Sequence, residues 1–362
     1  MIPSHRITIV STLTALAILS ASTLPAAEKF DTNPQHRLPR PDAKPADLKK
    51  SVKVFILLGQ SNMVGMGEVG PATTPGTLEY LTQTEKRYPH LVDDAGKWTV
   101  RSDVRHVFVM HNRGNMQLVQ NDWLTVKGRA IGPELQFGHI LGHVLDEPVL
   151  VLKTCIGNRS LGWDLLPPGS ERYTFDGKTY AGYKDTAESW VEGQPKKEVP
   201  WYAGKQYDDD TANAKQVLSE LGKYYPGAEK HEVAGFVWWQ GHKDQNPAHA
   251  SRYEQNLVRL IQSLRKDFNV PNAPFVLGVG CGNPGRESFG LQIAEAQLAM
   301  NNAQKYPAFA GNLKCVDTRD FWREVEVSPK NQGYHYNRNA ETYMEVGNAL
   351  GWAMAELLKA GK

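Results

Sequence analysis

An uninterrupted apolar run, Val54–Leu58, leads directly into the turn Gly59-Gln60-Ser61-Asn62-Met63. A run without polar alternation is typical of a strand buried on both faces of a parallel sheet, and such sheets carry their reactive loops beyond the carboxyl ends of the strands. A serine beside a glycine-containing turn can present its hydroxyl at that edge. The alternative is that Ser61 only caps a helix.

Further apolar runs alternate with helical patterns along the rest of the chain. The expected strands are Val54–Leu58, Val107–Met110, Val149–Leu152, Ala234–Trp239, Phe275–Val279 and Leu313–Val316. Apolar residues at helical spacing predict helices over Glu134–Asp146, around Tyr253–Leu264 and over Ala340–Lys359. This alternation predicts an α/β fold with a doubly wound, mostly parallel sheet.

Length and charge restrict the class of protein. The chain has 362 residues, 41% of them hydrophobic, and we expect one domain over residues 51–362. The 41 Lys and Arg residues nearly balance the 39 Asp and Glu residues, and the formal net charge is +2. A balanced charge argues against a polyanionic partner, so nucleic-acid binding is not expected.

The amino terminus reads as a targeting segment followed by a strap. His5 and Arg6 precede a mostly apolar stretch that ends in small residues near Ala27, which predicts a cleaved signal peptide over residues 1–27. Residues 28–50 contain several prolines among charges and suit a linker or surface strap. We therefore expect an exported protein, periplasmic or extracellular, with no integral membrane segment after cleavage.

Residues 167–209 form a long stretch rich in Tyr, Trp, Gly and charge, without a clear period. Long loops in compact domains are usually functional, and this one follows a strand of the expected reactive edge. It is predicted to be a substrate-binding insertion. A surface insertion without a role in binding is the equally weighted alternative.

Four groups suit acyl transfer, which requires a nucleophile, a base and oxyanion donors. Ser61 is the candidate nucleophile, and its backbone N–H is one candidate donor. Gly157 and the side chain of Gln240, each just beyond an expected strand, are the others, although a glutamine at a strand end is otherwise an ordinary surface residue. His335, in the loop before the last helix, is the candidate base. His242 is the second choice, as base or substrate contact.

These motifs recur in one order that resembles a known superfamily. Gly59-Gln60-Ser61-Asn62-Met63, Pro133-Glu134 with Phe137-Gly138, Lys153 to Leu161, Trp239-Gln240-Gly241 and a late histidine are together similar to the SGNH/GDSL hydrolases, and within them to the sialate O-acetylesterase-like carbohydrate esterases. The resemblance covers about Val52 to Leu358. It implies a three-layer α/β/α flavodoxin-like fold and removal of acetyl groups from sugars without a metal or other cofactor.

Carried over by position, the resemblance makes Ser61 the nucleophile, Gly157 and Gln240 parts of the oxyanion hole, and His335 the base. The family usually places an acid shortly before this histidine to orient it, but Asn331 and Gln332 stand there.

Another carboxylate must then orient the base, or a Ser–His dyad must operate. We expect Asp317 first, because it lies nearest a strand end, with Asp320 and Asp244 behind it and Glu341 weaker. The remaining residues near these motifs are expected to bind substrate: Gln60, Asn62, Asn158, His242 and Asp244.

The favoured function is an exported serine carbohydrate esterase that removes O-acetyl groups from glycans through an acyl-enzyme intermediate. Two alternatives stay open: a weak or inactive carbohydrate-binding protein on the same scaffold, and a general carboxylesterase or lipase-like enzyme. The sequence leaves the acetylated sugar and the position of its acetyl group undetermined.

Overall fold

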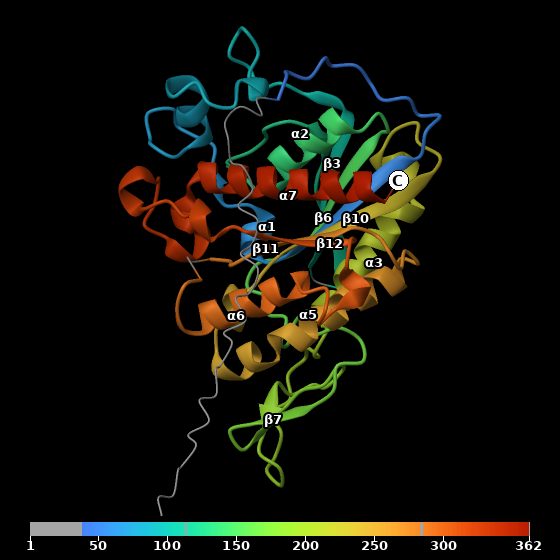
Figure 1. Cartoon of the computed structure of the whole chain (residues 1–362), viewed down its shortest axis with the longest axis vertical. Coiled ribbons are helices and arrows are strands. Elements are labelled where there is room, and N and C mark those ends of the chain that lie inside the picture. Colours follow the sequence, from blue (N-terminus) through green and yellow to red (C-terminus); the bar gives the residue numbers. More distant parts are fainter. Residues whose placement is uncertain (1–37, 113, 283–284, 362) are drawn as a thin grey trace, which may run out of the picture.

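A seven-stranded sheet forms the centre of the computed structural model, which describes residues 38–112, 114–282 and 285–361 (Figure 1). The strand order is β12-β11-β10-β1-β6-β3-β4. All neighbours pair in parallel except β3 and β4, which form an antiparallel hairpin. The bounds are β1 Val52–Gly59, β3 Arg101–Asn112, β4 Asn115–Leu124, β6 Val149–Thr154, β10 His231–Trp239, β11 Phe275–Val279 and β12 Leu313–Asp317.

The chain reverses its direction of travel across the sheet between β1 and β10. After β1 it continues to β3 and β6 on one side, whereas after β10 it continues to β11 and β12 on the other. The two strands end together, because Gly59 pairs with Trp239. Ligands of doubly wound sheets bind in the crevice at such a switch point, beyond the carboxyl ends of the strands.

Helices cover both faces of the sheet and give it three layers (Figure 1). On one face α2 (Glu134–Val144) and α7 (Ala340–Ala360) pack over Phe55 and Leu57 of β1. On the other face α3 (Lys205–Ser219), α5 (Pro247–Asp267) and α6 (Ser288–Leu298) pack over Val54, Ile56 and Leu58. The alternating β1 side chains therefore enter two separate cores, which explains the continuous apolar run. The predicted three-layer, mostly parallel α/β fold is confirmed.

All six expected strands and three expected helices are present, but several elements were missed. The strand β4 is the edge of the sheet and its residues are largely exposed, with polar residues interrupting its apolar ones. Helix α3 is polar overall, since only four of its residues pack in the core: Tyr207, Ala214, Val217 and Leu218. A helix that buries a narrow stripe gives a weak periodic signal.

The predicted insertion is ordered and ends earlier than expected. It contains a small antiparallel sheet of β7 (Tyr173–Phe175), β8 (Lys178–Tyr180) and β9 (Ser189–Trp190), which projects beyond α5 and α6 in Figure 1. Because α3 begins at Lys205, residues 205–209 belong to the helical layer rather than to the insertion. Two further short strands, β2 (Gly67–Glu68) and β5 (Ala130–Ile131), pair with each other.

The amino-terminal predictions fall partly outside the described residues. The expected signal peptide, 1–27, lies wholly outside them, as does the start of the 28–50 strap. Residues 38–50 run without helix or strand, anchored by buried Leu38 and by an Arg40–Asp94 ion pair of 2.5 Å. In the part of the chain that the structure describes, no helix is both long enough and apolar enough to cross a membrane.

Candidate active site

Ser61 opens the short helix α1 (Ser61–Val64) directly after β1. A Cβ at Gly59 would lie 2.2 Å from the carbonyl oxygen of Trp239, so only glycine allows β1 and β10 to approach this closely at their ends. Ser61 is largely buried, with 8% of its surface exposed at this end of the sheet. The side chain of Gln60 fixes the turn, since its Oε1 accepts from the N–H groups of Gly241 and Lys243, both at 3.3 Å.

The loop after β6 brings Gly157 to Ser61. A Cβ built on Gly157 would lie 3.5 Å from Ser61 Cβ, so this glycine faces the serine across the crevice. Among the described residues, the backbone N–H of Gly157 has no hydrogen-bond partner. The neighbouring Asn158 is exposed and has a positive φ of 57°. An unpaired backbone N–H therefore lies on a residue next to the candidate nucleophile, and the exposed Asn158 follows it.

Asn62 and Tyr343 tie the His335 loop to the Ser61 turn. Asn62 Nδ2 donates to the carbonyl oxygen of Tyr334 at 3.2 Å. The Tyr343 hydroxyl lies 2.7 Å from Asn62 Oδ1 and 3.2 Å from the carbonyl oxygen of His335. The predicted base and nucleophile, 274 positions apart in the sequence, are therefore held on neighbouring turns by one buried asparagine and one buried tyrosine.

The environment of His335 keeps its imidazole neutral. Burial lowers its pKa first, and the nearby charges of Arg338 and His242 lower it further, to about 4. Its Nδ1 is buried and has no hydrogen-bond partner among the described residues. A neutral imidazole can accept a proton at ordinary pH, but nothing in this part of the chain fixes its tautomer.

The structure does not bring Asp317 to His335, contrary to our expectation. Arg319 donates to both Asp317 carboxylate oxygens, at 2.8 and 2.5 Å, because the two side chains follow β12 on one tight turn. Gln332, shortly before the histidine, is also engaged: its Nε2 donates to the Tyr334 hydroxyl at 2.6 Å, and its Oε1 accepts from Arg338 at 2.5 Å.

The other candidate acids are likewise held elsewhere. Asp320 is exposed and pairs with Arg286, and Glu341 pairs with Arg87 and Arg323. None of these three carboxylates therefore contacts the His335 Nδ1 in the described structure.

Gln240 differs from the predicted oxyanion donor. Its side chain is fully buried, and Nε2 donates to the carbonyl oxygen of Arg159 at 2.9 Å and to Asp244 Oδ2 at 2.6 Å. Its Oε1 accepts from the Tyr253 hydroxyl at 2.9 Å. Both amide hydrogens are thus committed, and Gln240 braces the loop that carries Gly157 instead of facing the opening.

Three of the five predicted substrate contacts are buried instead. Gln60, Asn62 and Asp244 lie inside, with their polar atoms bonded to the protein. Only Asn158 is exposed, and His242 is half-buried. Motif position alone could not separate residues that build the site from residues that line it.

Tyr334 and Tyr343 were missed by the sequence reasoning. Tyr334 is 49% exposed, with its ring 4.5 Å from that of His335 and 6.2 Å from that of His242. Its position directly before the predicted base was the available signal. Tyr343 lies on the core face of α7, and its position in the helical pattern gives no sign of a polar role.

The buried His249 contacts both Asp244, in the turn after β10, and Glu188 of the insertion. His249 Nε2 is 3.4 Å from Glu188 Oε1, and its Nδ1 is 3.4 Å from Asp244 Oδ1. Burial alone would lower the pKa of His249, but these two carboxylates outweigh it and raise the pKa to about 9. The imidazolium is therefore the folded-state form at neutral pH.

We expect this histidine to make stability depend on alkaline pH. A pKa raised from 6.5 to about 9 stabilises the fold fully below pH 6.5, and this contribution is lost as the pH rises through 9. The loss is at most about 3 kcal/mol, since one pKa unit corresponds to about 1.4 kcal/mol. Denaturant unfolding of the native chain and of His249→Gln between pH 6.5 and 9.5 measures it. Equal slopes in the two proteins would contradict the assignment.

No metal site emerges in the described parts of the chain, where no group of three or more His, Cys, Asp or Glu residues could hold an ion. His139 and His143, four apart on α2, do not form a pair at the surface, because His139 is fully buried beside His90 and burial holds its pKa well below the usual value.

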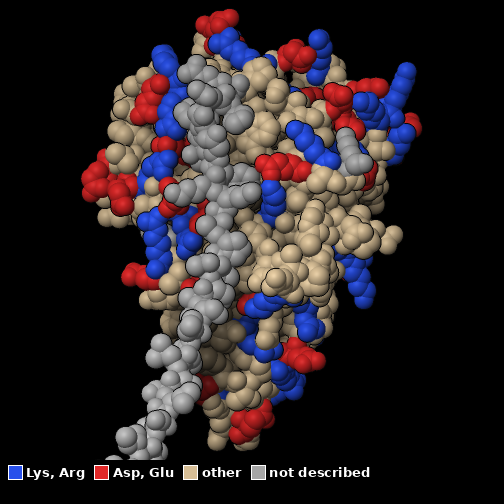
Figure 2. Space-filling model, viewed as in Figure 1, with Lys and Arg blue, Asp and Glu red and all other residues tan. Residues whose placement is uncertain are grey.

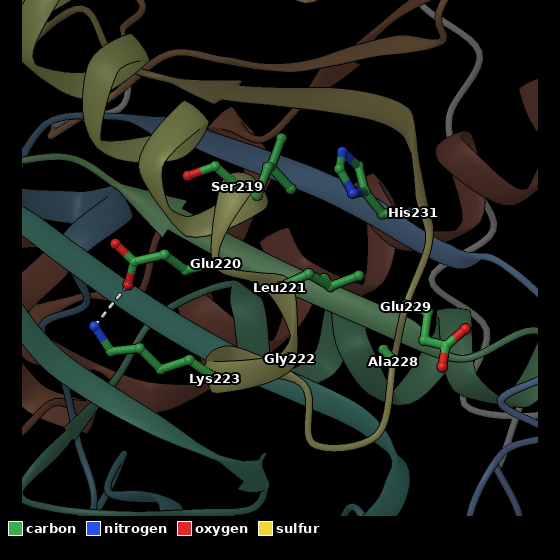
Figure 3. A pocket seen from close by; sticks show the side chains of 9 residues that line it. Ser219, Glu220, Leu221, Gly222, Lys223, Ala228, Glu229 and His231 are labelled. Carbon is green, nitrogen blue, oxygen red and sulfur yellow. Dashed lines mark hydrogen bonds and ion pairs between the residues drawn. The ribbon is translucent and has the colours of Figure 1, made fainter.

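The surface features elsewhere lie apart from this crevice. Acidic and basic side chains are interspersed over the face shown in Figure 2. A shallow hollow of about 500 Å³ lies at the opposite edge of the sheet, between the end of α3 and the start of β10 (Figure 3). Its lining includes the Glu220–Lys223 ion pair, His231 and Ser219, whose hydroxyl donates to the carbonyl oxygen of Gln216.

Known proteins resemble this chain to different extents. It is 32% identical over 89 residues to a probable carbohydrate esterase of Arabidopsis thaliana, and the match spans 24% of this chain and 30% of that relative. A solved structure of an Arabidopsis thaliana protein covers 84% of this chain and 98% of its own, at 17% identity and a TM-score of 0.49.

A carbohydrate acetylesterase from Xanthomonas citri covers 86% of this chain and 57% of its own, at 14% identity and a TM-score of 0.48. The sequence profile described as carbohydrate esterase, sialic acid-specific acetylesterase, matches residues 51–356, which is nearly the whole region beyond the strap. The chain belongs to this family of carbohydrate esterases.

Proposed function

We propose that this protein is an exported serine esterase that removes O-acetyl groups from glycans through an acyl-enzyme intermediate. The observation that carries the proposal is the convergence of three groups at one switch point: Ser61, the backbone of Gly157 next to it, and the His335 loop tied to the same turn. Family membership supplies the class of bond that is cleaved.

In the proposed mechanism the neutral imidazole of His335 accepts the Ser61 hydroxyl proton as Oγ attacks the acetyl carbonyl carbon. The N–H groups of Gly157 and Ser61 donate to the oxyanion, which needs such donors most when its charge develops. The bond to the sugar oxygen then breaks, and His335 returns the proton to that oxygen. Water, activated by the same imidazole, releases acetate and restores Ser61.

This scheme is compatible with the lack of an orienting acid beside His335 Nδ1 in the described part of the chain. The low pKa of His335 leaves its imidazole unprotonated at neutral pH, but it also makes the imidazole a weaker base, and an imidazolium without a carboxylate is stabilised less in the transition state. The same feature is the specific support for the second candidate, a carbohydrate-binding protein of weak or no activity on this scaffold. A general carboxylesterase is the third candidate, and it would hydrolyse simple esters without preferring acetylated sugars.

Acetate release and covalent labelling together test the proposal. The protein without residues 1–27 is incubated with an acetylated xylan, an O-acetylated sialic acid and a small acetyl ester, and acetate is measured. A fluorophosphonate that traps nucleophilic serines is then mapped by peptide mass. Release from a glycan, with the label on Ser61, is the expected result. Sugar binding without either signal would favour the binding scaffold, and hydrolysis of the small ester alone would favour the general esterase.

Export is tested separately by expressing the whole chain in a bacterial host and measuring the mature amino terminus. A periplasmic or secreted product that begins near Glu28 is expected. Retention of residues 1–27 in the cytoplasm would contradict export while leaving the chemistry untouched.

Gly157→Ala is expected to lower kcat/KM about tenfold to a hundredfold without changing stability. The added methyl would lie 3.5 Å from Ser61 Cβ, an ordinary contact for the fold, but it occupies the space where the ester must sit. Gly222→Ala is the matched control, because its methyl at the opposite edge meets only the Ala228 carbonyl oxygen, at 3.7 Å. Unchanged kinetics in Gly157→Ala would remove this loop from the oxyanion hole.

A further inference from the structure

Asp244 is a fully buried carboxylate that the proposed mechanism does not use. It lies in the short 3₁₀ turn His242–Asp244 between β10 and α5. Its Oδ2 accepts from the N–H of Leu161 at 2.8 Å and from Gln240 Nε2 at 2.6 Å, and its Oδ1 accepts from the N–H of Gly162 at 2.7 Å. A buried charge with three short donors is strongly held in one orientation.

These donors join two separate parts of the crevice. Leu161 and Gly162 close the loop that begins at β6 and carries Gly157, whereas Gln240 follows β10. Gln240 makes the second link, because its other amide hydrogen reaches the carbonyl oxygen of Arg159 within the same loop. The Asp244 carboxylate and the Gln240 amide therefore hold the loop by hydrogen bonds at Arg159, Leu161 and Gly162.

The cation that balances this carboxylate comes from α5. His249 packs so closely on the loop that a Cβ at Gly162 would lie 2.5 Å from its Cγ. Its ring lies 3.4 Å from Asp244 on one side and 3.4 Å from Glu188 of the insertion on the other. The carboxylate of Asp244 therefore lies between the loop and a histidine that also contacts the insertion.

We propose that Asp244 is the positioning residue of the oxyanion hole, which holds the loop from Gly157 to Gly162 so that the Gly157 N–H faces Ser61. This inference rests on the proposed serine esterase function and adds to it a residue that touches no substrate. An aspartate is required because a carboxylate only accepts, whereas an asparagine would turn its own NH₂ group toward one of three N–H donors.

Asp244→Asn tests the proposal with nearly unchanged volume. We expect kcat for acetyl ester hydrolysis to fall about tenfold to a hundredfold while KM stays within about threefold, because the oxyanion forms only in the transition state. Circular dichroism and thermal unfolding check that the variant is folded. Asp267→Asn is the matched control, since Asp267 also accepts a hydrogen bond, from Tyr207, but lies at the far end of α5.

A double-variant cycle separates positioning from a general loss of packing. If Asp244 acts through the loop, its effect on kcat in the Gly157→Ala background is much smaller than in the native protein. Should Asp244→Asn not fold, Gln240→Met removes the second link and is expected to show the same fall in kcat at unchanged KM.

The outcomes distinguish the two proposals. A native kcat in folded Asp244→Asn, or full additivity with Gly157→Ala, would overturn the positioning role while Ser61-dependent hydrolysis stands. A native protein without any Ser61-dependent hydrolysis would overturn both.

Discussion

Replacement of Ser61 by alanine is expected to lower kcat for acetyl ester hydrolysis by roughly 10⁴-fold or more, to the level left by binding and oxyanion donors alone. The variant removes only a hydroxyl that lies in the crevice, so the cores on both faces of the sheet keep their packing. Thermal unfolding should therefore change little. Acetate release under saturating substrate, together with loss of fluorophosphonate labelling, measures the effect.

Ser219→Ala is the matched control for this variant. Its hydroxyl only donates to the carbonyl oxygen of Gln216 at the end of α3, on the opposite edge of the sheet. Activity should be native in the control and nearly absent in Ser61→Ala. Equal activity in the two variants would contradict the mechanism with Ser61 as nucleophile. Another residue of this chain would then have to be the nucleophile.

Replacement of His335 by glutamine is expected to lower kcat/KM by about 10³-fold or more, the upper range for loss of a general base. The native pH profile carries a second signature. Because the His335 pKa is lowered to about 4, the base is already deprotonated at mildly acidic pH, and kcat/KM should rise through about pH 4 rather than 6.5. Hydrolysis rates between pH 3.5 and 8 measure this acid limb.

Arg338 provides an independent check on the cause of that limb. Its charge is one of the influences that lower the pKa of His335, so Arg338→Gln should move the limb toward higher pH. His231→Gln at the opposite edge is the control, and should leave the profile unchanged. A limb at 6.5 in the native protein, or full activity of His335→Gln, would contradict the assignment of the base.

Much of the fold followed from local patterns that depend on burial. The apolar run in β1 predicted a strand covered on both faces, and residues on its two sides do enter two cores. The strand β4 and the helix α3 escaped prediction because each buries too little apolar surface to impose a clear period. Tertiary contacts stabilise these elements, so their signal is spread over distant parts of the chain.

The sequence predicted only part of the site, because tertiary contacts decide the rest of it as well. The sequence predicted that Ser61, Gly157 and His335 lie at one edge of a parallel sheet because each follows or precedes a recognisable element, and their backbones are neighbours there. Proximity to a strand end did not identify an acid that orients His335. Asp317 lies at such an end, but its carboxylate pairs with Arg319, two residues later. Competition between neighbouring side chains for one partner is decided in three dimensions.

The sequence by itself determined the layered α/β architecture, the edge at which reactive loops gather, and the family of carbohydrate esterases. Only the tertiary structure decided which polar residues line the opening and which hold it together. Gln240 and Asp244 occupy motif positions like that of Ser61, yet both are fully buried and bonded to the loop behind Gly157. The reason is physical: a motif fixes where a residue lies along a strand, whereas its chemistry depends on the water and the partners that the other strands and helices leave to it.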